Sequence, residues 1–248
     1  MRPIVKSIKN NADGTPVEYN PWGDAKPELV EELGSFCSFC EKYNSRSALH
    51  VEHVYGKKCK DAADNYIYDH LKYRWDNFLL ACVNCNSVKH NQDIALTNPA
   101  LPHINNIIHF IESITGGIIA VKAGLTMQEL NQTNSFISLV GLDRIPGHPQ
   151  HSDKDDRWDE RLKVYDIVQR QLRKYENVPR KTELDTIVDL ARTNGCFSIW
   201  YYAFKKHEEV LDALINGMMI DGVLVKPFPG THIHSFDPTN QYDTVVRP

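Results

Sequence analysis

Two Cys-x-x-Cys pairs constrain this chain more than any other feature of its sequence. Cys37 and Cys40 stand in "CSFC", and Cys82 and Cys85 stand in "CVNC". Each pair can present two thiolates to one ion from a tight turn, and two such pairs are typical of a tetrahedral Cys₄ zinc site. Four buried thiols without a metal are the alternative. We predict structural Zn²⁺ at these four cysteines, with the remaining two of the six outside the site.

The residues between the pairs form an insert. Residues 41–81 separate the pairs, which is longer than the ~15–20 residues of a simple zinc ribbon. The stretch "ALHVEHV", residues 48–54, is typical of a short strand, yet polar side chains would project from both of its faces. A single histidine in such a strand is most often a surface or hydrogen-bonded core residue. His50, Glu52 and His53 together indicate a candidate site.

A third segment completes this candidate site. Asn77 precedes the second cysteine pair in "WDNFLLAC", and "CNSVKHN" predicts the start of a helix. On that helix Asn86 and His90 are four residues apart, so they share a face. A strand with Glu52 and His53, a loop anchored by Asn77 and this helix would together hold one hard divalent cation beside a free imidazole.

The order of these motifs resembles a known family. Cys-x-x-Cys, Glu-His, Asn and Cys-x-x-Cys-Asn, over roughly residues 36–92, are similar to the HNH endonucleases with a ββα-metal fold. "HVEHV" followed by "WDNFLLACVNCNSVK" further resembles the HNH proteins of the Septu type, which are PtuB-like. Those are bacterial antiphage proteins encoded beside an ATPase partner, in some cases within retron operons. The start "MRPI" and the helical remainder are also similar to that group.

The resemblance implies a role for each residue of the site. His53 would be the general base that activates water, and Asn77 would hold the loop and orient that base. Glu52, Asn86 and His90 would bind a catalytic Mg²⁺ or Mn²⁺, and the four cysteines a structural zinc. Asn86 stands where the family has its final histidine, and its amide oxygen favours Mg²⁺ or Mn²⁺ over Zn²⁺ or Ni²⁺. Further candidate contacts to phosphate or metal are His50, Lys57 and Lys89.

The reaction implied by the resemblance is hydrolysis of a phosphodiester bond in phage or plasmid DNA. The implied partners are a PtuA-like ATPase and, in some systems, a retron reverse transcriptase with its noncoding RNA–DNA. Many family members carry proline soon after Glu-His, where this chain has Gly56 and Lys57, so the path of the following loop is left open. Two alternatives are a zinc-knuckle module that binds nucleic acid or protein without cleavage, and an HNH nuclease acting on RNA.

Composition limits the class of protein. Hydrophobic residues make up 42% and charged residues 24% of the chain, with a formal net charge of −4, which is typical of a globular protein. No run of ~18 apolar residues occurs, so we expect no membrane span. "MRPIVKSIKN" lacks the apolar core of a secretory signal, which favours a cytoplasmic location and free thiols.

The resemblance implies a ββα-metal (HNH) nuclease core, and hydrophobic spacing predicts a mainly helical region after it, so that we expect an α+β fold. We expect an N-terminal arm and helix in residues 1–35, an HNH core with zinc knuckles in 36–95, and a mainly helical region in 96–248, by analogy a candidate partner-docking region. Trp22 in the arm is interpreted as a packing anchor, with a binding role as the alternative. Helices are predicted at residues 26–33, 101–117, 157–175, 182–195 and 198–216, a strand at 118–124 and a linker at 146–156.

Overall fold

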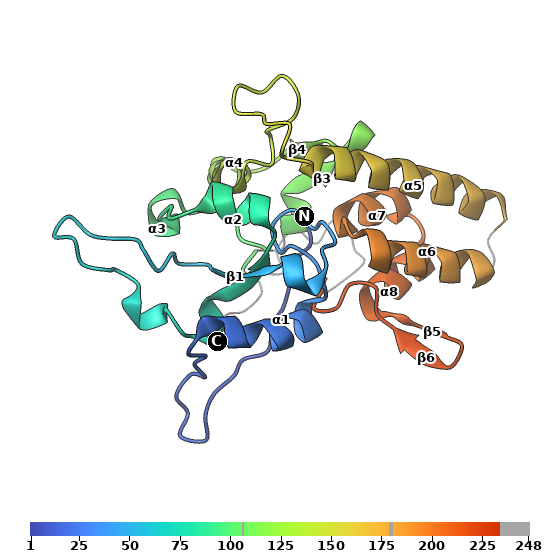
Figure 1. Ribbon diagram of the computed structural model, residues 1–248. Helices are drawn as coiled ribbons and strands as arrows, with labels where there is room; N and C mark the ends of the chain where they lie inside the picture. The colour runs from blue at the N-terminus through green and yellow to red at the C-terminus, as the bar shows by residue number, and fades with distance from the viewer. Residues whose placement is uncertain (106, 179–180, 234–248) are drawn as a thin grey trace.

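Small antiparallel hairpins and helices follow one another along the chain, and its C-terminal part is mainly helical (Figure 1). This computed structural model describes residues 1–105, 107–178 and 181–233. Its helices are α1 (Lys26–Leu33), α2 (Val83–Lys89), α3 (Ile94–Thr97), α4 (Met127–Val140), α5 (Arg157–Asn177), α6 (Lys181–Asn194), α7 (Phe197–Phe204) and α8 (Glu208–Asn216). Its hairpins pair β1 (His50–His53) with β2 (Phe78–Ala81), β3 (Ile111–Ser113) with β4 (Ile119–Val121), and β5 (Met218–Ile220) with β6 (Val223–Val225). The predicted α+β class is therefore confirmed.

The β1–β2 hairpin lies between the two cysteine pairs and carries most of the candidate site. Its strands are antiparallel, with His50 opposite Ala81 and His53 opposite Phe78. All four residues of β2 are buried, because α1 also packs against this strand, and a continuous apolar run suits a strand covered on both faces. α2 begins directly after β2, with Cys82 as its N-cap, and contacts β1. Strand, strand and helix therefore meet at one place.

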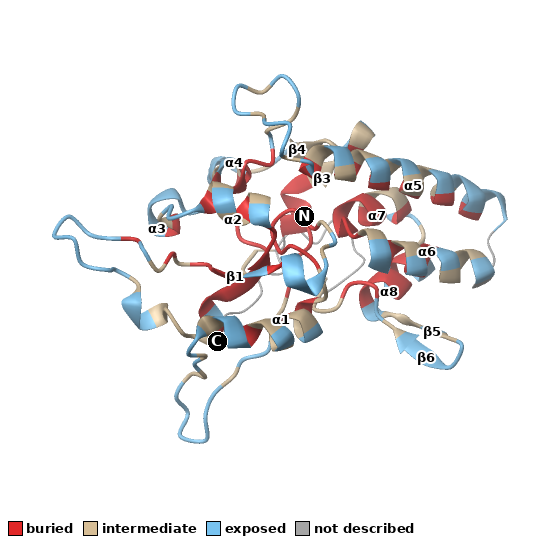
Figure 2. Ribbon diagram, in the orientation of Figure 1, coloured by how far each residue is buried: buried red, intermediate tan, exposed pale blue. Residues whose placement is uncertain are grey.

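Two hydrophobic clusters form the interior, which Figure 2 shows as buried segments through the middle of the molecule. The first surrounds the β1–β2 hairpin and the cysteine pairs, and includes Leu29 of α1 and Phe136 of α4. The second lies among α5, α6, α7 and α8, around Val168, Trp200 and Leu214. The candidate site therefore rests on the first cluster, and the C-terminal helices bury a second.

The structure contradicts the helix predicted over residues 101–117. Short 3-10 segments and strand β3 occupy the described residues of this stretch, and β3 pairs with β4. The isoleucines that suggested a helix are β-branched, so they lose rotamer freedom in a helix and suit a strand. Gly116 and Gly117 adopt positive φ between the two strands. The strand predicted within residues 118–124 is present as β4.

The predicted helices at residues 26–33, 157–175 and 182–195 are present as α1, α5 and α6. The single helix predicted over residues 198–216 is wrong, because α7 ends at Phe204 and α8 begins at Glu208. Both short helices contribute to the second hydrophobic cluster. One straight helix of that length would span about 28 Å and would carry one of its halves away from the cluster.

Two further findings concern membrane spans and cysteines. Within the described ranges, no helix combines the length and the apolar character needed to cross a bilayer. The six cysteines are free thiols, and all of them are buried.

Candidate metal centre and active site

The four cysteines of the two Cys-x-x-Cys pairs converge on one point. Their Sγ atoms all lie within 4.8 Å of one another, and all four residues are buried. The Sγ atoms of Cys40 and Cys82 are 3.7 Å apart, and tetrahedral Zn–S bonds of ~2.3 Å would place two sulfurs about 3.8 Å apart. Thiolate donors at this spacing fit a structural Zn²⁺. The predicted cluster of Cys37, Cys40, Cys82 and Cys85 is confirmed, and these residues would hold the ion.

Local backbone structure builds each half of this cluster. After the first pair, Glu41 adopts a φ of 66°, and its N–H donates to the Cys37 carbonyl at 3.0 Å. In the second pair, the Cys82 Sγ accepts from the Cys85 N–H at 3.5 Å as the cap of α2. The first turn precedes β1 and the second follows β2, so the hairpin between them brings the two pairs together.

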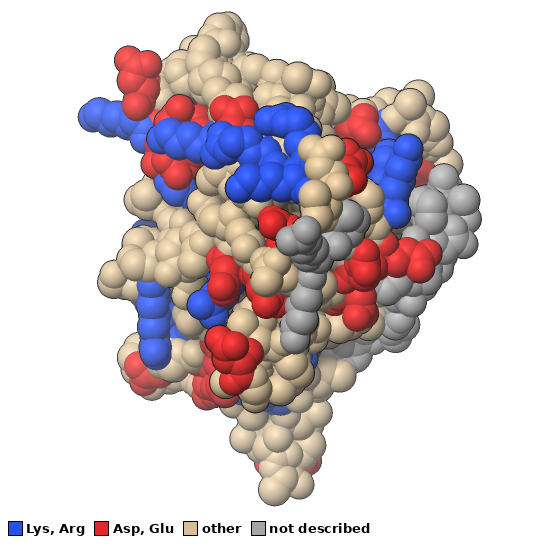
Figure 3. Space-filling view, turned by 90° about the vertical axis from the view of Figure 1, so that its right-hand side faces the viewer, with Lys and Arg blue, Asp and Glu red and all other residues tan. Residues whose placement is uncertain are grey.

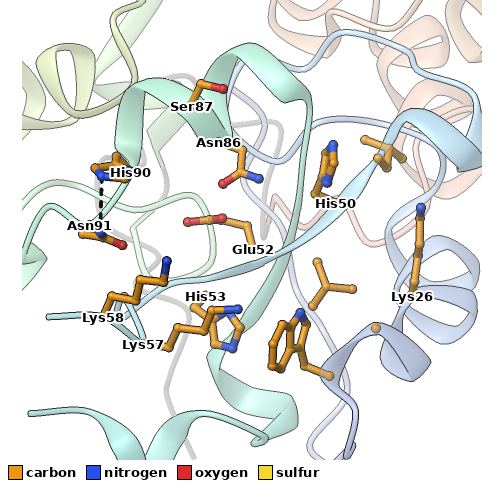
Figure 4. A pocket seen from close by; sticks show the side chains of 15 residues that line it. Lys26, His50, Glu52, His53, Lys57, Lys58, Asn86, Ser87, His90 and Asn91 are labelled. Atoms are coloured by element: carbon orange, nitrogen blue, oxygen red, sulfur yellow. Dashed lines mark hydrogen bonds between the residues drawn. The ribbon is translucent and has the colours of Figure 1, made fainter. Parts of the chain in front are cut away.

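A cavity of about 580 Å³ opens beside β1 and α2 (Figure 4). The residues predicted from the sequence that line it are His50, Glu52, His53, Lys57, Asn86 and His90. Figure 4 shows the Glu52 carboxylate and the Asn86 amide pointing into its middle, with His50 on one side and His90 on the other. The structure therefore brings these residues to one place, although they come from a strand, a loop and a helix.

Glu52 is buried and forms an ion pair with Lys89. The Lys89 Nζ lies 2.8 Å from Glu52 Oε1 and 2.8 Å from the His53 carbonyl oxygen, and Lys89 has no exposed surface. Burial raises the pKa of the Glu52 carboxyl, while the Lys89 ammonium acts against this rise. The sequence suggested Lys89 as a contact to phosphate or metal, but the structure buries it beneath Glu52, where it neutralises the carboxylate.

His53 is buried against aromatic rings at the edge of the cavity. Its Nε2–H donates to the Lys72 carbonyl at 2.8 Å, and because a carbonyl only accepts, the lone pair of the neutral ring is on Nδ1. The rings of Trp22 and Phe78 lie at centroid distances of 5.6 and 5.2 Å from the imidazole. Burial lowers the pKa of His53 to about 4, although the bond to Lys72 acts against this shift. The imidazole is therefore neutral at pH 7.

Asn77 anchors the loop that follows β1. Its Oδ1 accepts from the Tyr55 N–H at 2.8 Å, and its Nδ2 donates to the carbonyls of Tyr55 at 3.2 Å and Leu71 at 3.1 Å. These bonds join the segment after His53 to the segment before β2. The sequence predicted that Asn77 orients the base by hydrogen bonding. These bonds all go to backbone groups of Tyr55 and Leu71, so Asn77 holds the loop after β1.

His90 lies one residue beyond the end of α2, whereas the sequence predicted it on the same helix as Asn86. α2 ends at Lys89, and His90 follows as its C-cap with a φ of 45°, a conformation that cannot continue a right-handed helix. The His90 N–H still donates to the Asn86 carbonyl at 2.9 Å. Its Nε2 lies 3.2 Å from the Asn91 Nδ2. Both side chains line the cavity, His90 from beyond the end of the helix.

The donor set of this cavity differs from that of the cysteine cluster. Among the described residues, the four cysteines are the one group of three or more His, Cys, Asp or Glu that comes close enough to hold a metal ion. The cavity instead combines the Glu52 carboxylate and the Asn86 amide with imidazoles. Oxygen donors of this kind are the ligands preferred by Mg²⁺ and Mn²⁺, so the chemistry of the lining fits a hard cation.

The cavity also has aromatic and polar lining residues that sequence reasoning did not assign to the site: Trp22, Lys26, Lys58, Ser87 and Asn91. Trp22 and Lys26 come from the 3-10 helix Trp22–Ala25 and the start of α1. Both residues lie before the motif in the sequence, so nothing in the sequence indicated that they are close to the cavity. The other three could have been found from the sequence, because each directly follows a predicted site residue: Lys58, Ser87 and Asn91.

Comparisons with models of protein families, with curated proteins and with solved structures found no match to this chain.

Proposed function

We propose that this protein is a metal-dependent HNH-type endonuclease that hydrolyses phosphodiester bonds in DNA. The observation that carries the proposal is that Glu52, His53 and Asn86 line one cavity. Hydrolysis of a phosphodiester needs a base that accepts a proton from water and positive charge beside the phosphate. The neutral imidazole of His53 would be the base. The oxygens of Glu52 and Asn86 would hold a cation that supplies the positive charge.

His53 would act as the general base. Its Nε2–H is held by the Lys72 carbonyl, so Nδ1 would accept the proton of the attacking water. Because burial holds the pKa of His53 at about 4, the ring is unprotonated across the neutral range, which a base requires before it takes a proton from water. Asn77 would keep this ring in place through its bonds to the loop after β1.

Glu52 and Asn86 would hold Mg²⁺ or Mn²⁺ with their side-chain oxygens, and His50 or His90 could complete the set from either side of the cavity. Oε1 of Glu52 already accepts from Lys89, so Oε2 would be the oxygen that faces a cation. When bound, the cation would neutralise charge at the scissile phosphate and the leaving oxygen.

Lysines around the cavity support a polyanionic substrate. Lys26, Lys57 and Lys58 line it, and its carboxylate, Glu52, is neutralised by Lys89. On the face formed by the C-terminal helices, Figure 3 shows a row of Lys and Arg side chains bordered by Asp and Glu. We assign the nucleic-acid contact to the cavity, because its lysines line the same space as Glu52 and His53.

The sequence resemblance supports a biological setting for this activity. The Septu-type HNH proteins act in bacterial antiphage defence with an ATPase encoded alongside, in some cases with a retron reverse transcriptase. On that analogy the C-terminal helices would dock the ATPase, and the nuclease would act on phage or plasmid DNA in the cytoplasm, restrained by its partner.

The test is cleavage of plasmid DNA by the purified full chain with Mg²⁺ or Mn²⁺, alone and with the ATPase encoded beside it. We expect nicks or breaks, and His53→Ala should lower the rate by about 10²–10⁴-fold, the contribution of a general base. His70→Ala is the matched control, because His70 is exposed and does not line the cavity. Zinc content is measured in every variant, so that loss of the cysteine cluster cannot imitate loss of the base.

Two other outcomes would redirect the proposal. Nucleic-acid binding without cutting under any of these conditions, with zinc intact, would favour a zinc-knuckle binding module. Cleavage of RNA but not of DNA, again lost in His53→Ala, would keep the mechanism and change the substrate.

A further inference from the structure

Trp22 gives the cavity an aromatic wall from outside the β1–β2–α2 unit. We propose that the strand bound in this cavity is unpaired beside the scissile phosphate, with a base stacked on the Trp22 indole. The inference rests on the proposed nuclease function and deepens it, because it names single-stranded or locally opened polynucleotide as the substrate class.

The position of the indole supports this assignment. Trp22 lines the same cavity as Glu52 and Asn86, and its ring centroid lies 5.6 Å from that of His53, with the planes inclined at 70°. Stacked bases along a strand are about 3.4 Å apart. A base resting on the indole would therefore belong to a nucleotide next to the phosphate whose attacking water His53 activates.

Neighbouring side chains hold the Trp22 indole as a flat surface on which a base could stack, called the platform below. The Tyr73 ring stacks at 6.3 Å with an interplanar angle of 26°, which fixes the orientation of the indole. The Lys57 Nζ lies 3.3 Å from the indole centroid, a cation–π contact, and burial lowers the pKa of this ammonium. Because a lysine side chain is long and flexible, an arriving base could take its place on the ring while the ammonium moves to a phosphate.

A paired base could not use this platform. In a duplex each base is stacked between its neighbours, so an aromatic side chain reaches a base face only when the base is unpaired or extruded. The cationic rim of Lys26, Lys57 and Lys58 would hold the backbone of such a strand by charge. An aromatic platform within a basic groove is the combination used by proteins that bind single strands.

The experiment measures binding of three probes of one sequence, a DNA single strand, an RNA single strand and a DNA duplex. All proteins carry His53→Ala to prevent cleavage, and each is assayed as the zinc-loaded full chain. We expect the single strands to bind more tightly than the duplex. Trp22→Leu should weaken single-strand binding about 5- to 100-fold, the range for loss of one base–aromatic stack, and leave duplex binding unchanged.

The variants separate stacking from packing. Trp22→Leu keeps an apolar side chain at the site, and Trp22→Phe keeps an aromatic one, so Trp22→Phe should restore most of the single-strand affinity. Zinc content and thermal unfolding verify that both variants fold. Comparison of the DNA and RNA strands identifies which polynucleotide the platform takes.

Results that contradict base stacking on Trp22 can be told apart from results that contradict the nuclease function. Tighter binding of the duplex, or equal weakening of duplex and single strands in Trp22→Leu, would overturn the platform and leave the nuclease intact. The platform would also be overturned if Lys57→Gln/Lys58→Gln weakens single-strand binding and Trp22→Leu does not. If no polynucleotide binds and no plasmid is cut, both the proposed function and this inference fall.

Discussion

Arg157 donates a hydrogen bond from Nη1 to the Sγ of Cys85 at 3.2 Å. The same guanidinium donates to the carbonyls of Val140 at 2.6 Å and Gly141 at 3.0 Å, and to the Asp155 carboxylate. Arg157 is the first residue of α5, so the C-terminal helices touch the cysteine cluster directly. A zinc ion held by four thiolates has a net charge of about −2, and a buried guanidinium offsets part of it.

We predict from this contact that Arg157→Gln weakens zinc binding. Groups that hydrogen-bond to metal ligands typically contribute 10–100-fold to metal affinity, so a loss of about that size is expected. Competition with a chelator measures it. Arg173→Gln, an exposed change on the same helix, is the control and should retain wild-type affinity. Equal zinc affinity in the two variants would show that the guanidinium only packs against the sulfur.

The segment predicted as a linker, residues 146–156, leads into the same contact region. Asp155 accepts from the Asn84 amide at 3.1 Å, and Asp156 forms an ion pair with Lys42. Asn84 stands between the two cysteines of the second pair, and Lys42 follows the first pair by two residues. Proline, glycine and polar residues indicated a loop here, but sequence reasoning could not show which residues the loop contacts, because these contacts join residues far apart in the chain.

The buried ion pair between Lys89 and Glu52 predicts a large effect on stability. Lys89→Met would leave the Glu52 carboxylate buried without its cation, and should lower the free energy of unfolding by about 3–5 kcal/mol. The double variant Glu52→Gln/Lys89→Met removes both charges and should be more stable than Lys89→Met alone. Lys58→Met, an exposed change at the same cavity, should stay within about 0.5 kcal/mol of wild type.

Urea unfolding of the zinc-loaded proteins measures these differences. A double variant less stable than Lys89→Met would contradict the ion pair as the reason for the loss, and would point to the second bond of Lys89, to the His53 carbonyl.

Asn77 carries a third prediction, because its three hydrogen bonds tie the loop after His53 to the segment before β2. Asn77→Ala would leave the partly buried backbone groups of Tyr55 and Leu71 unsatisfied, which destabilises by about 1–3 kcal/mol. Hydrogen exchange at the Tyr55 amide should become faster than in wild type. Asn131→Ala, at an exposed position of α4, is the control. Unchanged exchange at Tyr55 would mean that other contacts hold the loop.

Local patterns accounted for part of the fold. The spacing of Cys37, Cys40, Cys82 and Cys85 was enough to predict their cluster, because each turn is determined by a few neighbouring residues. Two other local signals were present in the sequence and were not used. "TMQE" forms the capping box between Thr126 and Glu129 at the start of α4, and "DG" at residues 221–222 forms the positive-φ turn between β5 and β6.

The remaining features depend on contacts between distant residues. Whether the isoleucines near residue 110 form a strand or a helix is decided by the partner strand β4. The sequence suggested Lys89 as a contact to phosphate or metal, and its burial follows from the ion pair with Glu52, which is distant in the sequence. Trp22 joins the cavity because α1 packs against β2, which no spacing in the sequence could indicate.

The last prediction concerns the proton on His53. Burial lowers its pKa to about 4, below the ~6.5 of an exposed histidine. Between these two pH values the unfolded chain binds a proton at this ring and the folded chain does not. The contribution of His53 to the free energy of unfolding is therefore full above about pH 6.5 and is lost as the pH falls towards 4.

Nuclear magnetic resonance of the zinc-loaded protein, without added Mg²⁺ or Mn²⁺, measures this pKa directly. The His53 ring signal, assigned by its absence in His53→Gln, should not shift between pH 8 and pH 5.5, because the neutral ring is the one form present across that range. A signal that titrates near pH 6.5 would mean that water reaches the imidazole, and would contradict the expected dependence of stability on the protonation of His53.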